Sequence, residues 1–297
     1  TQFAFHLELI RLLKPVLLTW ESWFFFIHMS TSSTTSSAVR SAWSISDQVG
    51  WLLRFGMLGC FVGHGIWGLL HKPGWLPFFE IYFIPKHIAY QLMPFVGIMD
   101  ILIGVVAFFK PNRTILIWAA FWTLFTALLR PCAGMGMSEF FERGGNYGLP
   151  LALLYIVGWP KTTKDWFSAL SFQSIEHKIT HPHFEKIVRL CLVMLLAGHG
   201  GLAFFVQSPL LEKHLSFLGL SLPNQLQWFG LFEMALAVFV WFRSRTPYLM
   251  FFIVAFKLFS ESLHPIVGHT RDVLETIERM GDYILPLVLW TLYKNEK

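Results

Sequence analysis

Eight long apolar segments constrain the fold of this chain more than any other feature of its sequence. They lie at about 51–70, 88–109, 113–129, 145–160, 190–206, 226–242, 247–263 and 281–293. The hydrocarbon core of a bilayer is about 30 Å thick, so a helix that crosses it needs about 20 mostly apolar residues. Apolar runs of this length do not alternate as barrel strands do. The sequence therefore predicts an all-α, polytopic membrane protein with about eight transmembrane helices.

Charge composition supports this class and gives an orientation. Only 14% of the 297 residues are charged and 55% are hydrophobic, whereas soluble domains carry about a quarter charged residues. The net charge of +5 comes mostly from loops on one side of the predicted helices, as the positive-inside rule describes. We therefore expect both termini and the central linker in the cytoplasm, the lipid bilayer as partner, and no nucleic-acid binding.

The first 50 residues form a predicted N-terminal extension. Residues 1–28 do not begin with methionine and carry Lys14 and Glu21 inside their apolar part, whereas Met29 opens an ordinary polar stretch. We interpret Met29 as the true start and residues 1–28 as upstream sequence or an interfacial helix. A ninth spanning helix is the alternative.

The second half of the chain repeats the first. Reading from Arg54 and from Arg189, the same pattern occurs as RFGMLGCFVGHGIW and as RLCLVMLLAGHGGL. It continues as FFERGGNYGLP and TIERMGDYILP, and the offset stays between 133 and 136 residues. We expect a duplication, with repeat 1 at 51–160, a cytoplasmic linker at 161–188 and repeat 2 at 189–293. Four spans per copy give the copies one orientation, related by an axis along the membrane normal.

These matched segments resemble the DoxX family of small bacterial inner-membrane proteins, named for a subunit of an archaeal terminal quinol oxidase. The resemblance covers about 54–160 and 189–293 and rests on the FVGHG opening, the Gly/Asp face of the second helix and the LLRP segment. The usual family member has one four-helix unit, so the duplication is a departure. The resemblance implies a tandem DoxX-like protein of the bacterial cytoplasmic membrane, with links to quinol and thiol redox chemistry.

Ionisable residues inside the apolar segments are the first candidates for a functional site, because each costs at least about 2.5–3.5 kcal/mol at the bilayer centre and normally faces protein. Asp100 lies on a stripe of small residues with Gly97 and Gly104, and Glu233 occupies the matching place in the second half. Both carboxylates should face neighbouring helices. A structural hydrogen bond and a proton-handling or ligand-binding role are the two alternatives.

The third predicted span of each half has diverged. Arg130 near its outer end is explained either by snorkelling or by recognition of an anionic or carbonyl group. In the second half Lys257, Glu261 and His264 share one helical face. They form either a self-neutralising set or a titrating site that only this half contains.

A third group of candidates precedes the last span of each half. It consists of Glu142, Arg143 and Asn146, matched by Glu278, Arg279 and Asp282. Their spacing predicts that Glu142 and Asn146, and likewise Glu278 and Asp282, share one helical face, where they cap and pair charges. Together with Arg130 and the histidine-bearing helix ends, they are expected to close one polar pocket per repeat on the outer side.

His64 and His199 occur in the repeated Gly-His-Gly tripeptide. Gly56, Cys60, His64 and Gly68 recur every four residues, so His64 should face another helix, with Asp100 or Glu142 as partner. Structural hydrogen bonding, a proton or quinone contact, and metal or haem ligation are the alternatives. Haem is disfavoured, because Cys-x-x-Cys-His is absent, and no metal site is expected.

Several other sequence features are weaker indications of a functional site. The three cysteines, Cys60, Cys132 and Cys191, form no Cys-x-x-Cys pair and are expected as buried filler. The linker histidines, His177, His181 and His183, lack a completing ligand pair and suit a solvated segment. The aromatic loop at 72–87 suits an interfacial helix that can also roof the pocket.

These observations favour a membrane protein whose outward-facing polar pockets bind a quinone or another small lipophilic molecule, as an accessory component beside membrane redox partner proteins. No catalytic motif indicates an enzyme. The alternative is a proton-coupled small-molecule transporter that uses Lys257 and Glu261.

Overall fold

Every regular element in the described part of the chain is a helix, as a sequence of this composition predicts. The computed structural model describes residues 44–170, 176–219, 222, 224–242 and 245–295. The predicted start at Met29 and the possible ninth helix therefore lie outside the described residues. Six helices are long and apolar enough to cross a membrane. They are α2 (Ile45–Leu69), α4 (Lys86–Phe109), α5 (Arg113–Cys132), α10 (Pro182–Gly201) with its π-helical extension η2 (Leu202–Val206), α12 (Gln225–Phe242) and α13 (Pro247–Val267).

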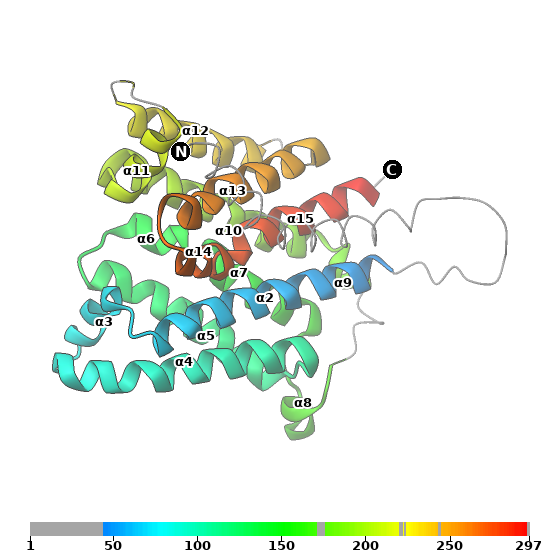
Figure 1. Cartoon of the computed structure of the whole chain (residues 1–297). Helices are drawn as coiled ribbons and strands as arrows, with labels where there is room; N and C mark the ends of the chain where they lie inside the picture. Colours follow the sequence, from blue (N-terminus) through cyan, green and yellow to red (C-terminus); the bar gives the residue numbers. More distant parts are fainter. Residues whose placement is uncertain (1–43, 171–175, 220–221, 223, 243–244, 296–297) are drawn as a thin grey trace. The chain divides into compact units, whose positions relative to one another are not determined.

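The other two predicted spans are helices too, but they are shorter. The helix α7 (Gly144–Val157) has 14 residues and α15 (Met280–Asn295) has 16. At 1.5 Å per residue they are about 21 and 24 Å long, less than the hydrocarbon thickness of about 30 Å. Figure 1 shows them in the middle of the bundle, with α4 on one side and α12 on the other. They pack against each other and against α2 and α10, so their side chains are mostly buried by protein.

Short helices connect the long ones. The aromatic loop forms η1 (Pro73–Trp75) and α3 (Leu76–Glu80), and α11 (Pro209–Phe217) occupies the corresponding place in the second half. The remaining short helices are α6 (Met137–Glu142), η3 (Thr270–Asp272) and α14 (Val273–Glu278), and the linker contains α8 (Thr163–Phe167) and α9 (Glu176–Ile179). Local signals set several boundaries: the Asn112 side chain caps α5 by accepting from the Ile115 amide at 3.0 Å, and α13 begins with Pro247.

The second glycine of the Gly-His-Gly tripeptide lets α2 and α4 cross at close range. A Cβ on Gly65 would lie 2.5 Å from the carbonyl oxygen of Gly97. The same holds for Gly200 and Gly230 where α10 crosses α12, at 2.6 Å. These distances leave no room for a side chain, so the small-residue stripes of the sequence mark the helix crossings.

The short helices α6 and α14 each pack on a long helix of the other half. The first half supplies α6, which packs on α10 of the second half, while α14 of the second half packs on α2 of the first. Each is separated from the following helix by one arginine with a non-helical ψ, Arg143 at 10° and Arg279 at 24°. The prediction that Glu142 and Asn146 share one helical face is therefore wrong, and so is the equivalent prediction for Glu278 and Asp282. The helix is interrupted at each arginine, and the chain changes direction there. The members of each pair therefore lie on different helices.

Candidate functional site

The first of two cavities is apolar and belongs to the first half alone. Its volume is about 190 Å³, and its walls come from α2, α4, α5, the aromatic loop and the start of α7. Seven phenylalanine, tryptophan and tyrosine side chains line it: Phe61, Trp75, Phe78, Phe79, Tyr82, Trp122 and Phe125. The predicted roofing of a pocket by the loop at 72–87 is therefore present in the structure.

A hydrogen-bonded histidine and aspartate lie on this wall. His64 Nδ1 is 2.9 Å from Asp100 Oδ2, and the indole Nε1 of Trp122 donates to Asp100 Oδ1 at 2.8 Å. The His64 ring also stacks on Trp75, with ring centroids 4.6 Å apart. Asp100 is 1% exposed, so the prediction that it faces protein is confirmed. Of the two partners expected for His64, Asp100 is the one that it contacts.

Further polar side chains line the first cavity, among them Arg130, Arg143 and Asn146. Arg130 projects from the end of α5 and pairs with Glu139 at 2.7 Å, and its guanidinium lies 5.5 Å from the centre of the Phe78 ring. Asn146 reaches the cavity from α7. Arg130 uses one nitrogen for Glu139, so its other donors can serve a ligand.

The second cavity is larger and charged. Its volume is about 620 Å³, and its lining includes side chains of both halves. The expectation of one pocket per repeat is wrong in composition, because α6 packs on α10 and brings Glu142 to this second cavity, whereas Arg143 lines both cavities. Its ionisable lining includes Lys72, Arg130, Glu139, Glu142, Arg143, His199, Lys213, His214, Glu233, Lys257, Glu261, His264, His269, Asp272, Glu275 and Arg279.

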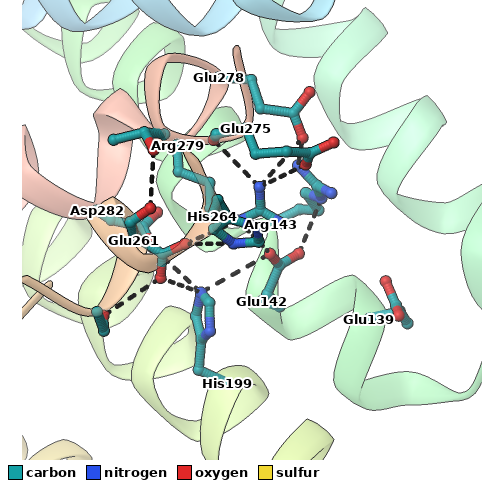
Figure 2. A network of polar contacts seen from close by, with 12 residues as sticks. Glu139, Glu142, Arg143, His199, Glu261, His264, Glu275, Glu278, Arg279 and Asp282 are labelled. Atoms are coloured by element: carbon teal, nitrogen blue, oxygen red, sulfur yellow. Dashed lines mark hydrogen bonds and ion pairs between the residues drawn. The ribbon is translucent and has the colours of Figure 1, made fainter. Parts of the chain in front are cut away.

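Two Glu-Arg dipeptides pair crosswise beside this cavity, as Figure 2 shows. Arg143 donates to Glu278 at 3.1 Å, and Arg279 lies 3.4 Å from Glu142. The four side chains come from the corresponding ends of α6 and α14. The predicted charge-pairing cluster therefore exists, and its members pair between the halves as well as within each dipeptide, where Arg143 lies 2.8 Å from Glu142 and Arg279 lies 3.5 Å from Glu278.

Mutual charge stabilisation shifts the pKa values of this group. Burial alone would raise the pKa of Glu142, but Arg143 and Arg279 outweigh it and hold the pKa at about 2. Glu278 is buried as well, and Lys72 and Arg143 hold its pKa well below the ordinary value. Burial would lower the pKa of Arg143, but the neighbouring Glu142 and Glu278 raise it. All four groups are therefore charged at neutral pH.

The predicted face of α13 joins the same network. Lys257 is fully buried, and its Nζ lies 2.9 Å from Glu261 and 3.5 Å from Glu233. His264 Nε2 is 3.2 Å from the other oxygen of Glu261. Glu233 is 1% exposed, which confirms that it faces protein. The lysine and glutamate are thus paired as expected, within a larger set than their own helix provides.

His199 lies among carboxylates of three helices (Figure 2). Its Nε2 is 3.1 Å from Asp282, 3.7 Å from Glu142 and 3.9 Å from Glu261. His199, Glu261 and Asp282 each offer one ligand atom, and these three atoms lie within 4.8 Å of one another. A metal ion can bridge atoms at this spacing. His64 and His199 line different cavities, and this arrangement does not favour a haem between them.

The sequence-based interpretation missed three groups that the structure places at these cavities. Trp122 lies one turn before Thr126 and two turns before Arg130, so helical periodicity could have placed it on the same face. Lys72 forms an ion pair with Glu275 at 2.5 Å, although its place in an interfacial loop indicated only topology. His214 on α11 lies 4.8 Å from His264, ring to ring, and no sequence pattern indicates that contact.

The weaker candidates, which are the cysteines and the linker histidines, do not line the second cavity. Cys60 and Cys191 are buried as expected, whereas Cys132 is exposed, because α5 ends there at the surface. His177, His181 and His183 are exposed, and His181 caps α10 by accepting from the His183 amide at 3.2 Å.

The chain as a whole matches no protein-family model, no curated protein and no solved structure.

Proposed function

We propose that this chain is a DoxX-like integral membrane protein built from two tandem four-helix units. Two observations support the duplication: the matched sequence segments, and the order of long and short helices, which is the same from α2 to α7 as from α10 to α15. In this proposal α7 and α15 complete the eight spans. The protein resides in the bacterial cytoplasmic membrane with both termini in the cytoplasm.

The ligand of this protein is a small lipophilic molecule with a polar ring, of the quinone class, and it binds in the first cavity. The observation that carries this proposal is an aromatic cavity of about 190 Å³ with a His64–Asp100 pair on its wall. A dry cavity of about 150 Å³ holds a benzene molecule, so this one accommodates a single substituted ring. Aromatic walls with a few placed polar groups are typical of such sites.

The polar groups suit the two oxygens of a quinone or quinol. With Nδ1 of His64 bound to Asp100, Nε2 of the same ring is available to accept a quinol hydroxyl or, when protonated, to donate to a quinone carbonyl. Asp100 fixes the orientation of the His64 ring. Arg130 offers a second donor to the other oxygen or to an anionic form. Membrane redox proteins are the partners that would consume or supply such a ligand.

The test uses purified, detergent-solubilised full-length chain. We expect an organic extract of the protein to contain a quinone, and equilibrium dialysis with a short-tailed ubiquinone to show binding. Asp100→Asn removes the charge that holds His64 and should weaken that binding about 10-fold or more. An empty extract together with no binding of the added quinone would overturn the proposal.

A matched pair of tryptophans separates a site effect from general destabilisation. Trp122 donates to Asp100 and lines the cavity, whereas Trp118 lies one turn earlier on α5 and is 41% exposed. Trp122→Phe should weaken quinone binding, and Trp118→Phe should leave it unchanged. Equal losses in both variants would contradict the assignment of the first cavity.

Proton-coupled transport stays a prediction from the sequence. Its test is substrate-dependent proton flux into proteoliposomes, which Glu261→Gln should abolish.

A further inference from the structure

His199 is the meeting point of carboxylates from three different helices. Its Nε2 lies closest to Asp282 on α15, at 3.1 Å. Oxygens of Glu142 on α6 and Glu261 on α13 follow at 3.7 and 3.9 Å. A ring nitrogen carries at most one hydrogen and can donate it to one oxygen. A hydrogen bond from His199 therefore accounts for one of these three contacts.

We propose that a divalent transition-metal ion binds between His199, Glu261 and Asp282. Metal–ligand distances of about 2.0–2.2 Å place neighbouring ligand atoms of a four- to six-coordinate ion about 3.0–3.6 Å apart. The distance of 3.1 Å from His199 Nε2 to Asp282 lies in that range and the distance of 3.9 Å to Glu261 exceeds it slightly, so small side-chain movements complete the site.

The surrounding network contains more carboxylates than lysines and arginines. Ion pairs within 4.0 Å connect six carboxylates to only four lysines and arginines in the described part of the chain. The acids are Glu142, Glu233, Glu261, Glu275, Glu278 and Asp282, and the bases are Lys72, Arg143, Lys257 and Arg279. A divalent ion on a neutral histidine balances the two excess negative charges, which are costly inside a helix bundle.

Two buried polar atoms indicate that the second cavity holds a ligand. Glu233 Oε2 and His214 Nε2 have no hydrogen-bond partner in the described part of the chain. Their side chains are 1% and 3% exposed, and both residues line this cavity together with His199 and Glu261. Buried polar atoms are normally satisfied, so partners for them are expected from the cavity. The same cavity gives an ion a path to its ligands.

Lys257 competes with the ion for two carboxylate oxygens, and Glu233 offers its ammonium another partner. Its ammonium contacts Glu261 Oε1 at 2.9 Å and Asp282 Oδ2 at 3.5 Å, which are oxygens that the metal needs. Glu233 is also 3.5 Å away, and its second oxygen lacks a hydrogen-bond partner among the described residues. When the ion binds, the ammonium moves toward Glu233. Replacing Lys257 should therefore tighten metal binding.

The ligand set identifies the class of ion. One imidazole nitrogen with two carboxylates suits Zn²⁺, Mn²⁺ or Fe²⁺, whereas Mg²⁺ and Ca²⁺ prefer oxygen ligands alone and Cu⁺ prefers sulfur. Two side chains orient the Glu261 carboxylate from outside, His264 and Arg279, which lie 3.2 and 3.3 Å from its Oε2. The site does not depend on quinone binding in the first cavity.

The test is metal titration of the chelator-treated, tag-free full-length chain in detergent. We expect one Zn²⁺ per chain by calorimetry, and Co²⁺ in its place should give ligand-field absorption bands that Zn²⁺ displaces. His199→Gln and Asp282→Asn should each weaken Zn²⁺ binding about 100-fold, while Lys257→Met should bind Zn²⁺ more tightly than the wild type. Absence of stoichiometric Zn²⁺ binding, or weaker binding by Lys257→Met, would overturn the proposal.

A control variant removes a buried carboxylate elsewhere. Glu185 is 6% exposed and accepts from Tyr293 and Arg245 at 3.0 Å, away from both cavities. Glu185→Gln should bind Zn²⁺ as the wild type does, and a loss equal to that of Asp282→Asn would contradict the site. If Asp282→Asn does not fold, Glu261→Gln and the Co²⁺ spectrum of the wild type decide the question.

Discussion

Gly63 lies directly against the backbone of Glu278. A Cβ on Gly63 would be 2.6 Å from the Glu278 amide nitrogen, and the equivalent close contact joins Gly198 to the Glu142 amide. The first glycine of each Gly-His-Gly tripeptide is thus the point where the short helix of the other half docks. The neighbouring histidines lie within each cavity wall, so the glycines set the approach of the helices and the histidines carry the polar contacts.

Replacing Gly63 by alanine should destabilise the protein. The added methyl group meets backbone atoms of Glu278, which cannot move as a flexible side chain would, and overpacking of this kind costs about 1–3 kcal/mol. Thermal unfolding in detergent measures the loss. Gly74→Ala is the control, because a methyl group on Gly74 would have no atom within 4 Å of it. Equal melting temperatures for the wild type and Gly63→Ala would show that α14 does not dock on α2 in this way.

The crosswise pair of Arg143 and Glu278 should show strong coupling in a double-mutant cycle. Each residue is at most 8% exposed, so removing either one takes a partner from a buried charge, although Arg143 keeps Glu142 at 2.8 Å and Glu278 keeps Arg279 at 3.5 Å. Single substitutions to methionine should therefore cost about 1–3 kcal/mol. The double variant should recover part of this loss, because neither charge remains. Additive losses would contradict a direct pair.

An ion pair whose arginine is exposed gives the baseline for that cycle. Arg245 pairs with Glu185 at 3.0 Å, but its side chain is 58% exposed. Arg245→Met should therefore change the free energy of unfolding by no more than about 1 kcal/mol. A loss as large as that of Arg143→Met would mean that burial does not decide the cost of removing these arginines.

The helices were predictable from the sequence because their cause is local. A run of about 20 apolar residues satisfies its own backbone only as a helix, and each of the eight predicted segments is helical. The contact of His64 with Asp100 was predictable as well, because both residues lie on stripes of small residues and such stripes mark helix crossings.

The charged network was not predictable from local patterns. Arg143 meets Glu278 across 135 residues of chain, and this contact depends on the packing of α6 and α14 on the long helices of the other half. Regular spacing also suggested one helical face for Glu142 and Asn146, whereas the backbone turns at Arg143 and sends them to different cavities. A turn at one residue carries little sequence signal, and long-range pairing carries none.

Stability should depend on pH through Glu278. Lys72 and Arg143 overcome the effect of burial and hold its folded-state pKa well below the ordinary value of 4.5. A depressed carboxyl pKa contributes stability above the unfolded-state pKa and loses it as pH falls toward the folded-state pKa. The stability difference between wild type and Glu278→Gln should be constant above pH 4.5 and should shrink below it.

Unfolding free energies of both proteins across an acid series measure this dependence. Glu80 is exposed, so Glu80→Gln supplies the comparison for an ordinary surface carboxylate. A difference between wild type and Glu278→Gln that grows as pH falls below 4.5 would contradict the sign, and would mean that Glu278 is held in its neutral form.

The orientation proposed for the membrane can be tested at Cys132. This thiol is exposed at the end of α5, whereas Cys60 and Cys191 are buried, so a charged maleimide should modify Cys132 alone. With the linker in the cytoplasm, α5 runs outward and Cys132 should react in intact spheroplasts. The control is Lys161→Cys in a Cys132→Ser background, because residue 161 is exposed at the start of the linker and should react only after permeabilisation. The reverse pattern would invert the topology, and it would place Arg130 and both cavities at the cytoplasmic side.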